Sequence, residues 1–329
     1  MSKRYDVVGI GNAIVDVFCP SDHAFLERMR IQPGIMQLVE RERGEELYAA
    51  MSERTQSAGG SVGNTIAGIG SLGLKAGFIG RVNDDELGQS YAADMARQGT
   101  DFVNPPVSGG ELPTSRSMIF VGRDGERSMN TYLGISAELG PEDVADGVAG
   151  DCRFLFLEGY LYDKPKGMAA FDRAAQICRA AGGQAGITLS DPFCVDRHRA
   201  AFRRLVRELD YVIGNEHEWE SLYQTDLSSA LEQAATEAGL VVCTRSGSAV
   251  VLVRGDETVE VPVNRVVPVD ATGAGDQFAA GFLYGLVRGL PLAVCGRMGC
   301  VAASEVIGHF GARPETDVKS LFRAAGLPD

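Results

Sequence analysis

The sequence lacks the cysteine and histidine patterns that hold zinc or build a disulfide framework. Its seven cysteines are scattered and odd in number, no two of them form a CxxC pair, and there are only four histidines. Such cysteines are typical of buried free thiols in a reducing compartment. No apolar run reaches membrane-spanning length and the amino terminus carries no apolar secretory segment. We therefore expect a cytoplasmic protein with no membrane partner.

Positive charge is also scarce. The formal net charge is −13 at pH 7, from 31 Lys and Arg against 44 Asp and Glu. This balance argues against a nucleic-acid partner, because no basic surface is available for a phosphate backbone. Local amides or a divalent metal would have to hold any phosphate. The GxxxxGK[ST] motif is absent as well, which excludes a P-loop enzyme.

The composition suits a large α/β core. The chain has 329 residues, of which 45% are hydrophobic and 23% charged, so we expect one large domain with an appendage, or two domains. Strand and helix patterns alternate from about residue 154 onward. Strands are predicted at 154–157, 184–189, 211–213 and 240–244, and helices near 167–181, 197–208, 216–223 and 227–238. This alternation predicts a parallel sheet with helices on both faces.

Two stretches, 17–43 and 104–132, interrupt that alternation with proline, glycine and short β-prone runs. Asp124-Gly125 lies between two such runs and predicts a hairpin turn. We expect the two stretches to form one small β-sheet that acts as a lid. The large domain would then comprise residues 1–16, 44–103 and 133–329.

A glycine-rich segment at 270–276 leads directly into an amphipathic helix. Gly273, Ala274 and Gly275 leave the free N–H groups of the helix start open to a ligand, and the helix dipole favours a negative one. Asp276 is a carboxylate at the mouth of this anion site. It is therefore placed to take a proton from a hydroxyl nucleophile. The alternative interpretation is a glycine-rich helix start capped by an acid.

A second glycine-rich segment, 59–64, also opens a helix. Each glycine weakens a helix by up to ~1 kcal/mol, so the close approach of a ligand or strand explains their number. Asn12 and Asp16 follow the first strand, where open α/β sheets bind ligands, and Asp16 suits sugar hydroxyls. A turn aspartate is the alternative. The GxG at 9–11 lacks the third glycine of a dinucleotide fingerprint, which disfavours an NAD-dependent dehydrogenase.

Three acids, Glu216, Glu218 and Glu220, follow the strand predicted at 211–213. They could hold Mg²⁺ directly or through water. Acids are equally favoured in the first turn of a helix, and the sequence leaves both interpretations open.

Together, the two glycine-rich segments resemble the two signatures of the PfkB (ribokinase-like) family of carbohydrate and nucleoside kinases. The likeness covers essentially the whole chain, and residues 215–218 stand at the family's NxxE position. Residues 5–16, 129–134 and 157–161 look most like the bacterial adenosine-kinase-like branch. The resemblance implies a ribokinase-like α/β fold, with a central mostly parallel sheet, helices on both faces and a small β-sheet lid.

The resemblance also implies an ATP-dependent kinase that uses Mg²⁺ and, in many members, K⁺. Asp276 would deprotonate a sugar 5′-hydroxyl while Gly273, Ala274 and Gly275 supply the anion-hole amides. The nucleotide loop departs from the family pattern, because the family's glycine aligns with Gly247 only through a gap or is replaced by Ala249. The remaining assignments are substrate binding by Asn12, Asp16, Gln37, Gly59, Gly60, Ser61 and Asn64, nucleotide binding by Asn215, Thr244, Gly247 and Gly275, Mg²⁺ held through water by Glu218, and a monovalent cation at Asp270 and Thr272.

The acceptor is expected to be adenosine. Met36, Gln37 and Leu38, with a strand ending at Tyr132, offer apolar surface for a flat purine and one amide to read its edge. A PfkB-type sugar kinase acting on ribose, fructose or a related sugar is the alternative. An NAD-dependent dehydrogenase and a non-catalytic nucleoside- or sugar-binding protein are further ones. We expect a monomer or homodimer.

Overall fold

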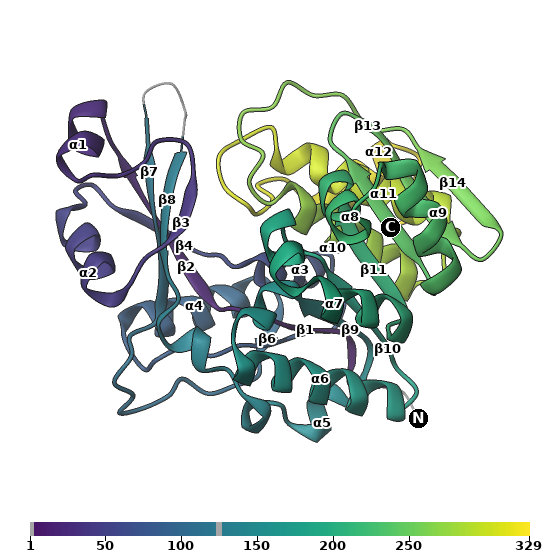
Figure 1. Cartoon of the computed structure of the whole chain (residues 1–329), viewed down its shortest axis with the longest axis horizontal. Helices are drawn as coiled ribbons and strands as arrows, with labels where there is room; N and C mark the ends of the chain where they lie inside the picture. The colour runs from purple at the N-terminus through teal and green to yellow at the C-terminus, as the bar shows by residue number, and fades with distance from the viewer. Residues whose placement is uncertain (1–2, 123–126) are drawn as a thin grey trace.

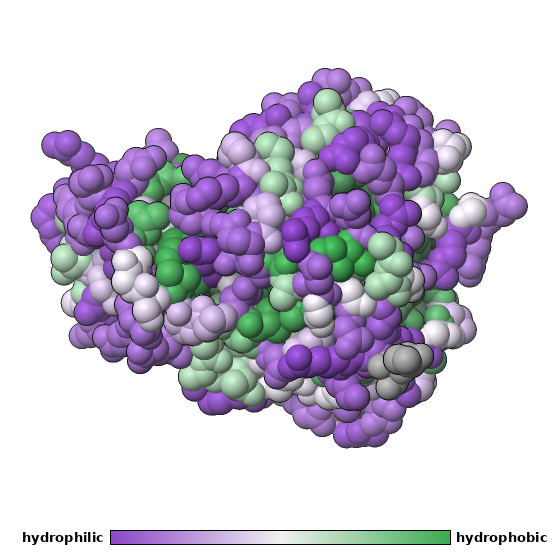
Figure 2. Space-filling model, turned by 90° about the horizontal axis from the view of Figure 1, so that it is seen from below, coloured by the Kyte–Doolittle hydropathy of each residue, from purple (hydrophilic) through white to green (hydrophobic). Residues whose placement is uncertain are grey.

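The structure, a computed structural model, describes residues 3–122 and 127–329 and contains a large and a small β-sheet (Figure 1). The turn predicted at Asp124-Gly125 lies outside the described residues. The seven cysteines are buried and free, as their spacing predicts. None of the described helices is long and apolar enough to cross a membrane. Seen from below, the surface is mostly hydrophilic (Figure 2).

The large sheet has nine strands in the order β14-β13-β12-β11-β10-β9-β1-β5-β6. All neighbouring strands are parallel except at the β12–β13–β14 edge, where they are antiparallel. The predicted α/β fold is therefore confirmed. The strands are β1 (Tyr5–Ile10), β5 (Ala76–Ile79), β6 (Thr100–Phe102), β9 (Cys152–Glu158), β10 (Gln184–Thr188), β11 (Tyr211–Asn215), β12 (Val241–Arg245), β13 (Ser248–Arg254) and β14 (Glu257–Val261).

Helices cover both faces of this sheet, because successive strand residues point to opposite sides. Val7 and Phe156 pack in one hydrophobic core, whereas Val8 and Leu157 pack in the other. The first core includes α3 (Ser61–Ser71), α4 (Glu86–Arg97), α10 (Ala274–Val287) and α11 (Leu292–Val306). The second includes α6 (Pro165–Ala180), α7 (Pro192–Glu208), α8 (Glu216–Tyr223) and α9 (Leu227–Glu237). α5 (Asp146–Ala149) adds to the second face and α12 (Val318–Ala324) packs beside α11.

The small sheet has the order β3-β8-β7-β2-β4 and joins both predicted interruptions. Its strands are β2 (Ile14–Pro20), β3 (Met36–Leu38), β4 (Thr55–Ala58), β7 (Ser115–Val121) and β8 (Arg127–Tyr132). The predicted boundaries at residues 16 and 44 need correction. β2 begins before residue 16, and β4 pairs antiparallel with β2 although 44–103 was assigned to the large domain. This pairing supplies hydrogen bonds to a strand that would otherwise be an open edge.

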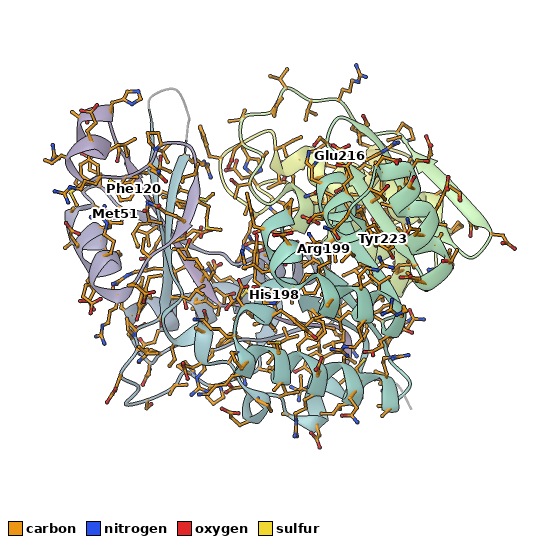
Figure 3. All side chains as sticks on the ribbon, in the orientation of Figure 1. Met51, Phe120, His198, Arg199, Glu216 and Tyr223 are labelled. Atoms are coloured by element: carbon orange, nitrogen blue, oxygen red, sulfur yellow. The ribbon has the colours of Figure 1, made fainter. Side chains whose placement is uncertain are left out.

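The two faces of the small sheet differ. On β2, Val15 and Val17 are buried, whereas Asp16 and Phe18 on the opposite face are only half-buried. The buried face packs against α1 (His23–Arg28) and α2 (Arg41–Ala50), with the Phe25 and Phe120 rings 5.4 Å apart. Phe120 and Met51 lie in this part of the molecule (Figure 3). The other face is turned toward the large domain (Figure 1).

Candidate active site

The glycine-rich turn before α10 has a backbone that requires glycine. Gly273 is the N-cap with φ 78° and ψ 0°, a left-handed conformation that favours glycine. A Cβ at Gly273 would also lie 2.6 Å from the Cα of Ala312. Gly275 is different, because a Cβ there would meet no atom within 4 Å among the described residues. Gly275 therefore leaves open space at the helix start, as the predicted anion site requires.

Asp276 brings the two glycine-rich segments together. Its Oδ1 accepts a hydrogen bond from the Ser61 hydroxyl at 2.9 Å, and its Oδ2 accepts one from the Asn64 amide at 3.1 Å. Burial raises the pKa of Asp276 to about 6, although the bonds from Asn64 and Ser61 and the charge of Arg313 each act to lower it. A carboxylate with this pKa is ionised at neutral pH and is still basic enough to receive a proton.

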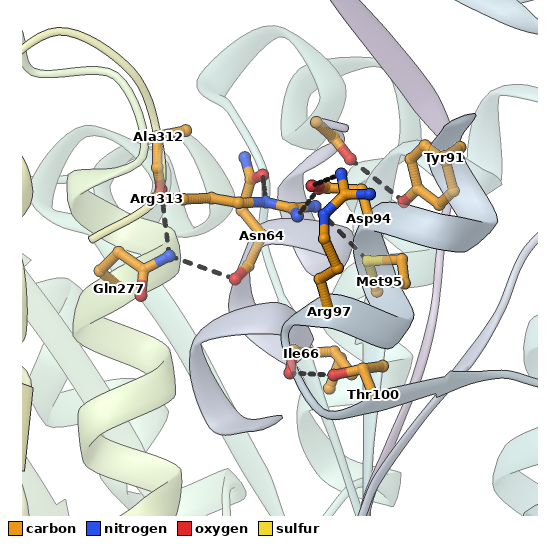
Figure 4. Close-up of polar contacts among 11 residues, drawn as sticks. Asn64, Ile66, Tyr91, Asp94, Met95, Arg97, Thr100, Gln277, Ala312 and Arg313 are labelled. Atoms are coloured by element: carbon orange, nitrogen blue, oxygen red, sulfur yellow. Dashed lines mark hydrogen bonds and ion pairs between the residues drawn. The ribbon is translucent and has the colours of Figure 1, made fainter. Parts of the chain in front are cut away.

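Arg313 and Gln277 both contact Asn64, the residue that donates to Asp276 (Figure 4 shows the contacts to Asn64). The Nε of Arg313 donates to Oδ1 of Asn64 at 3.3 Å, and its guanidinium forms an ion pair with Asp94 of α4. Gln277 donates to the backbone oxygens of Asn64 at 3.1 Å and Ala312 at 3.0 Å. The sequence analysis missed Arg313, which stands in a loop 249 residues from Asn64 and in no recognised motif.

Asp16 lies beside the glycine-rich segment 59–64 that opens α3. A Cβ at Gly59 would be 2.3 Å from Oδ2 of Asp16, and a Cβ at Gly60 would be 2.3 Å from the backbone oxygen of Asn12. These two glycines therefore permit the close approach that their number predicts. Burial raises the pKa of Asp16 to about 7, with Arg313 lowering it and Asp276 raising it further.

Asn12 lies beside Gly60, and both polar atoms of its side chain already form hydrogen bonds within the protein. Its amide nitrogen donates to Oε1 of Glu158 at 2.7 Å, and its oxygen accepts from the Ser136 hydroxyl at 3.2 Å. Glu158 ends β9, is 1% exposed, and also accepts from the backbone N–H of Val62 at 3.2 Å. Burial raises the pKa of Glu158 to about 7. The sequence analysis missed Glu158, which links β1 to the start of α3.

The prediction that the Gln37 amide reads the edge of the purine requires a correction, because Gln37 lies on the opposite face of the small sheet. Strand register pairs Gln37 with Asn130 and Asn130 with Met118, so these three side chains share the face that packs on α1 and α2. The Gln37 amide donates to Oδ1 of Asn130 at 2.8 Å. Its neighbours Met36 and Leu38 point the other way, and alternation along the strand is the reason.

A cavity of about 810 Å³ opens beside the start of α10. It brings together Asn215, Thr244 and Gly247 from the edge of the large sheet with Ala274 and Gly275. These residues come from three separate segments and include the predicted nucleotide-binding positions. Glu216, at the start of α8, also lines the cavity (Figure 3). The volume lies within the range of small-molecule sites.

Glu218 and Asn215 form a capping box at the start of α8. Glu218 accepts from the Asn215 backbone N–H at 2.8 Å and its side-chain amide at 2.6 Å, and the Asn215 oxygen accepts from the Glu218 backbone N–H at 3.0 Å. Burial raises the pKa of Glu218 to about 8. The described residues contain no cluster of three or more His, Cys, Asp or Glu side chains arranged to hold a metal. The Mg²⁺ role of Glu218 stays a prediction.

Asp270 and Thr272, the predicted cation ligands, contact Arg127 of β8. The Nη2 of Arg127 lies 2.7 Å from Oδ2 of Asp270 in a buried ion pair. Its Nη1 donates to the Thr272 hydroxyl at 3.3 Å. The small sheet and the turn before α10 are thus joined directly.

Comparisons with known proteins agree with this geometry. Residues 34–318 match the pfkB family of carbohydrate kinases. The chain is 45% identical to adenosine kinase from Sinorhizobium meliloti, covering 98% of this chain and 99% of that one with a TM-score of 0.90. It is 44% identical to a probable sugar kinase from Rhizobium etli, covering 99% and 100% with a TM-score of 0.91.

The named activities of similar proteins extend from nucleoside kinases to sugar kinases. The 5-dehydro-2-deoxygluconokinase of Shouchella clausii is 25% identical over 334 residues, covering 98% of this chain and 95% of the relative. The family match spans most of the chain, and the relatives are named as kinases of both nucleosides and sugars. The chain therefore belongs to the pfkB family of carbohydrate kinases.

Proposed function

We propose that this kinase transfers the γ-phosphoryl group of ATP to the 5′-hydroxyl of a nucleoside, with adenosine as the acceptor and AMP as the product. One observation carries the proposal. Asp276 stands in the same helical turn as Ala274 and Gly275, which line the 810 Å³ cavity, and its carboxylate contacts Ser61 and Asn64 of the second glycine-rich segment. Donor phosphate and acceptor hydroxyl would therefore meet at one carboxylate.

Each part of the arrangement has a task in phosphoryl transfer, which needs positioning, neutralisation of charge and an acceptor for the hydroxyl proton. Asp276 takes the proton from the hydroxyl. The backbone N–H of Gly275 stabilises the negative charge on the transferring group, whereas that of Ala274 already donates to the backbone oxygen of Ala271 at 3.2 Å. Mg²⁺, when bound with ATP, neutralises further phosphate charge. Asp16 accepts hydrogen bonds from the sugar hydroxyls, which holds the 5′-carbon toward Asp276.

The small sheet supports a nucleoside rather than a free sugar. Met36 and Leu38 are 44% and 56% exposed on the face turned toward the large domain. Register places Met129 and Phe18 on the same face, together with Ile119, which is itself buried. An apolar wall of this kind suits a flat purine, whereas a free hexose needs a ring of polar groups. The similarity to the Sinorhizobium adenosine kinase supports the same acceptor.

A sugar acceptor is the second candidate, because relatives named 5-dehydro-2-deoxygluconokinase match nearly the full chain. An ADP-release assay with Mg·ATP separates the two. The acceptors are adenosine, guanosine, inosine, ribose, fructose, fructose phosphates and 5-dehydro-2-deoxygluconate. Adenosine is expected to show the largest kcat/KM. A sugar or sugar acid that exceeds adenosine by about tenfold would reject the nucleoside and leave the kinase in place.

A further inference from the structure

A buried arginine occupies the position predicted for a monovalent cation. Arg127 and Asp270 have side chains only 8% and 6% exposed, and their charged atoms lie 2.7 Å apart. The same guanidinium donates to the hydroxyl of Thr272 at 3.3 Å. Arg127 therefore contacts both residues that the sequence assigns to the cation.

The oxygens of Asp270 are already used. Oδ1 accepts the backbone N–H of Thr272 at 3.1 Å and its hydroxyl at 2.7 Å. Oδ2 accepts the backbone N–H of Gly311 at 3.0 Å and faces Arg127. The negative charge of Asp270 is thus neutralised by a fixed guanidinium, and a second cation at this point would be repelled by it. These residues do not fit a bound monovalent cation.

The guanidinium is held on further sides by aromatic rings. Its carbon lies 5.4 Å from the centre of the Phe18 ring and 5.3 Å from that of Phe310. Cations are attracted to the faces of such rings. Phe18 belongs to the small sheet, whereas Phe310 belongs to the loop that follows α11. Arg127 is therefore fixed by both parts of the molecule.

We propose that Arg127 is a positioning residue that takes the place of the monovalent cation, so that the kinase works without K⁺ and its anion site is set by the small sheet. The statement that the kinase works without K⁺ rests on the proposed function. Asp270 and Thr272 form the turn that precedes Gly273, the N-cap of α10. Neutralising Asp270 keeps that turn, which the bond from the Ala274 N–H to the Ala271 oxygen also closes, in the shape that presents the amide of Gly275 to phosphate.

The first test uses the wild-type enzyme. ADP release is measured with Mg·ATP and adenosine in the chlorides of K⁺, Na⁺ and choline at equal ionic strength. The proposal predicts the same kcat in all three within about twofold. A kcat in K⁺ more than about fivefold above that in choline would overturn it, because a cation would then be needed despite Arg127.

The second test removes the guanidinium. Arg127→Met is expected to lower kcat in choline by about tenfold or more, and K⁺ or millimolar guanidinium is expected to restore part of the loss. Arg116→Met is the matched control, because Arg116 is a buried arginine of the same sheet that instead stacks over Tyr48 at 4.4 Å. Its kcat should not respond to the cation. Wild-type kcat in choline for Arg127→Met, or a loss that neither cation restores, would overturn the proposal.

A binding readout makes the result independent of the acceptor. K⁺ should raise the melting temperature of Arg127→Met above that in choline and leave that of the wild type unchanged, since only an open site gains stability from a ligand. A K⁺-specific rise for the wild type would overturn the inference. If no acceptor gave ADP release, the proposed function would fail, while these melting temperatures would still decide the role of Arg127.

Discussion

Arg313 fixes the direction in which the amide of Asn64 points. Its Nε donates to Oδ1 of Asn64 at 3.3 Å, which leaves the Asn64 nitrogen to donate to Asp276 at 3.1 Å. The guanidinium is itself held by Asp94. A charged side chain thus orients a neutral amide against the proposed base, and its positive charge lowers the pKa of that base.

This relationship predicts a shift in the pH dependence of kcat/KM. The base must be ionised, so activity should rise with pH through about 6, the pKa of Asp276. Arg313→Met removes a positive charge that lowers the pKa of Asp276. The neighbouring carboxyl groups of Asp16 and Glu158, which interact with Asp276, would remain. The acidic limb should therefore move to higher pH.

Arg313→Lys is the control for the pH experiment, because it keeps the charge but loses the bond geometry to Asn64. Its kcat should fall while its acidic limb stays near that of the wild type. An unshifted limb in Arg313→Met would show that Arg313 has only a structural role.

Gly59→Ala tests the acceptor side. The new Cβ would lie 2.3 Å from Oδ2 of Asp16 and must displace that carboxylate. We expect KM for the acceptor to rise by about tenfold with little change in KM for ATP. Gly147→Ala is the control. Gly147 lies on α5, which contributes no residue to the proposed site, and a Cβ there meets no described atom within 4 Å. Equal KM values for Gly59→Ala and wild type would remove Asp16 from the acceptor site.

Gly275→Ala tests the donor side. A Cβ at this position has open space in the protein, so the melting temperature should not fall. It would instead occupy the place where phosphate approaches the amides of α10. We expect kcat/KM for ATP to fall by about tenfold. Unchanged kinetics with ATP would place the phosphate elsewhere.

The small sheet is expected to close over the acceptor and keep water from the transferring phosphoryl group. Amide hydrogen exchange in residues 17–43 and 114–132 should slow when adenosine binds. Residues 184–188 of β10 lie within the large sheet and serve as the reference. If exchange in both segments of the small sheet stays at the unliganded rate, the sheet does not act as a lid.

Local patterns were enough to predict much of the fold. The helix of α10 and the alternation from β9 to β12 follow from apolar periodicity, and the two glycine-rich segments predict close approach. β4 was missed because Thr55–Ala58 carries little apolar pattern, with three exposed residues of four. Its strand character comes from pairing with β2, which no local signal records.

The site was harder to predict, because its contacts cross long distances in the sequence. Ser61 and Asp276 are 215 residues apart, and only the paired signatures indicated that they meet. Arg127 and Arg313 stand outside any motif, so nothing in the sequence singled them out. Glu158 lies in the stretch 157–161 that carries part of the family resemblance, but the resemblance gave it no role of its own. The face on which Gln37 lies depends on the register of β3 against β8, which composition does not determine.

The most direct test of the account is AMP formation from Mg·ATP, measured with adenosine and with 5′-deoxyadenosine for wild type and Asp276→Asn. The account predicts AMP from adenosine only, and a kcat for Asp276→Asn at least ~10²-fold lower with ATP binding nearly intact, because the base is lost while the anion site remains. A variant that keeps more than about a tenth of the wild-type kcat would contradict the role of Asp276. A wild-type enzyme that forms no AMP would contradict the proposed reaction.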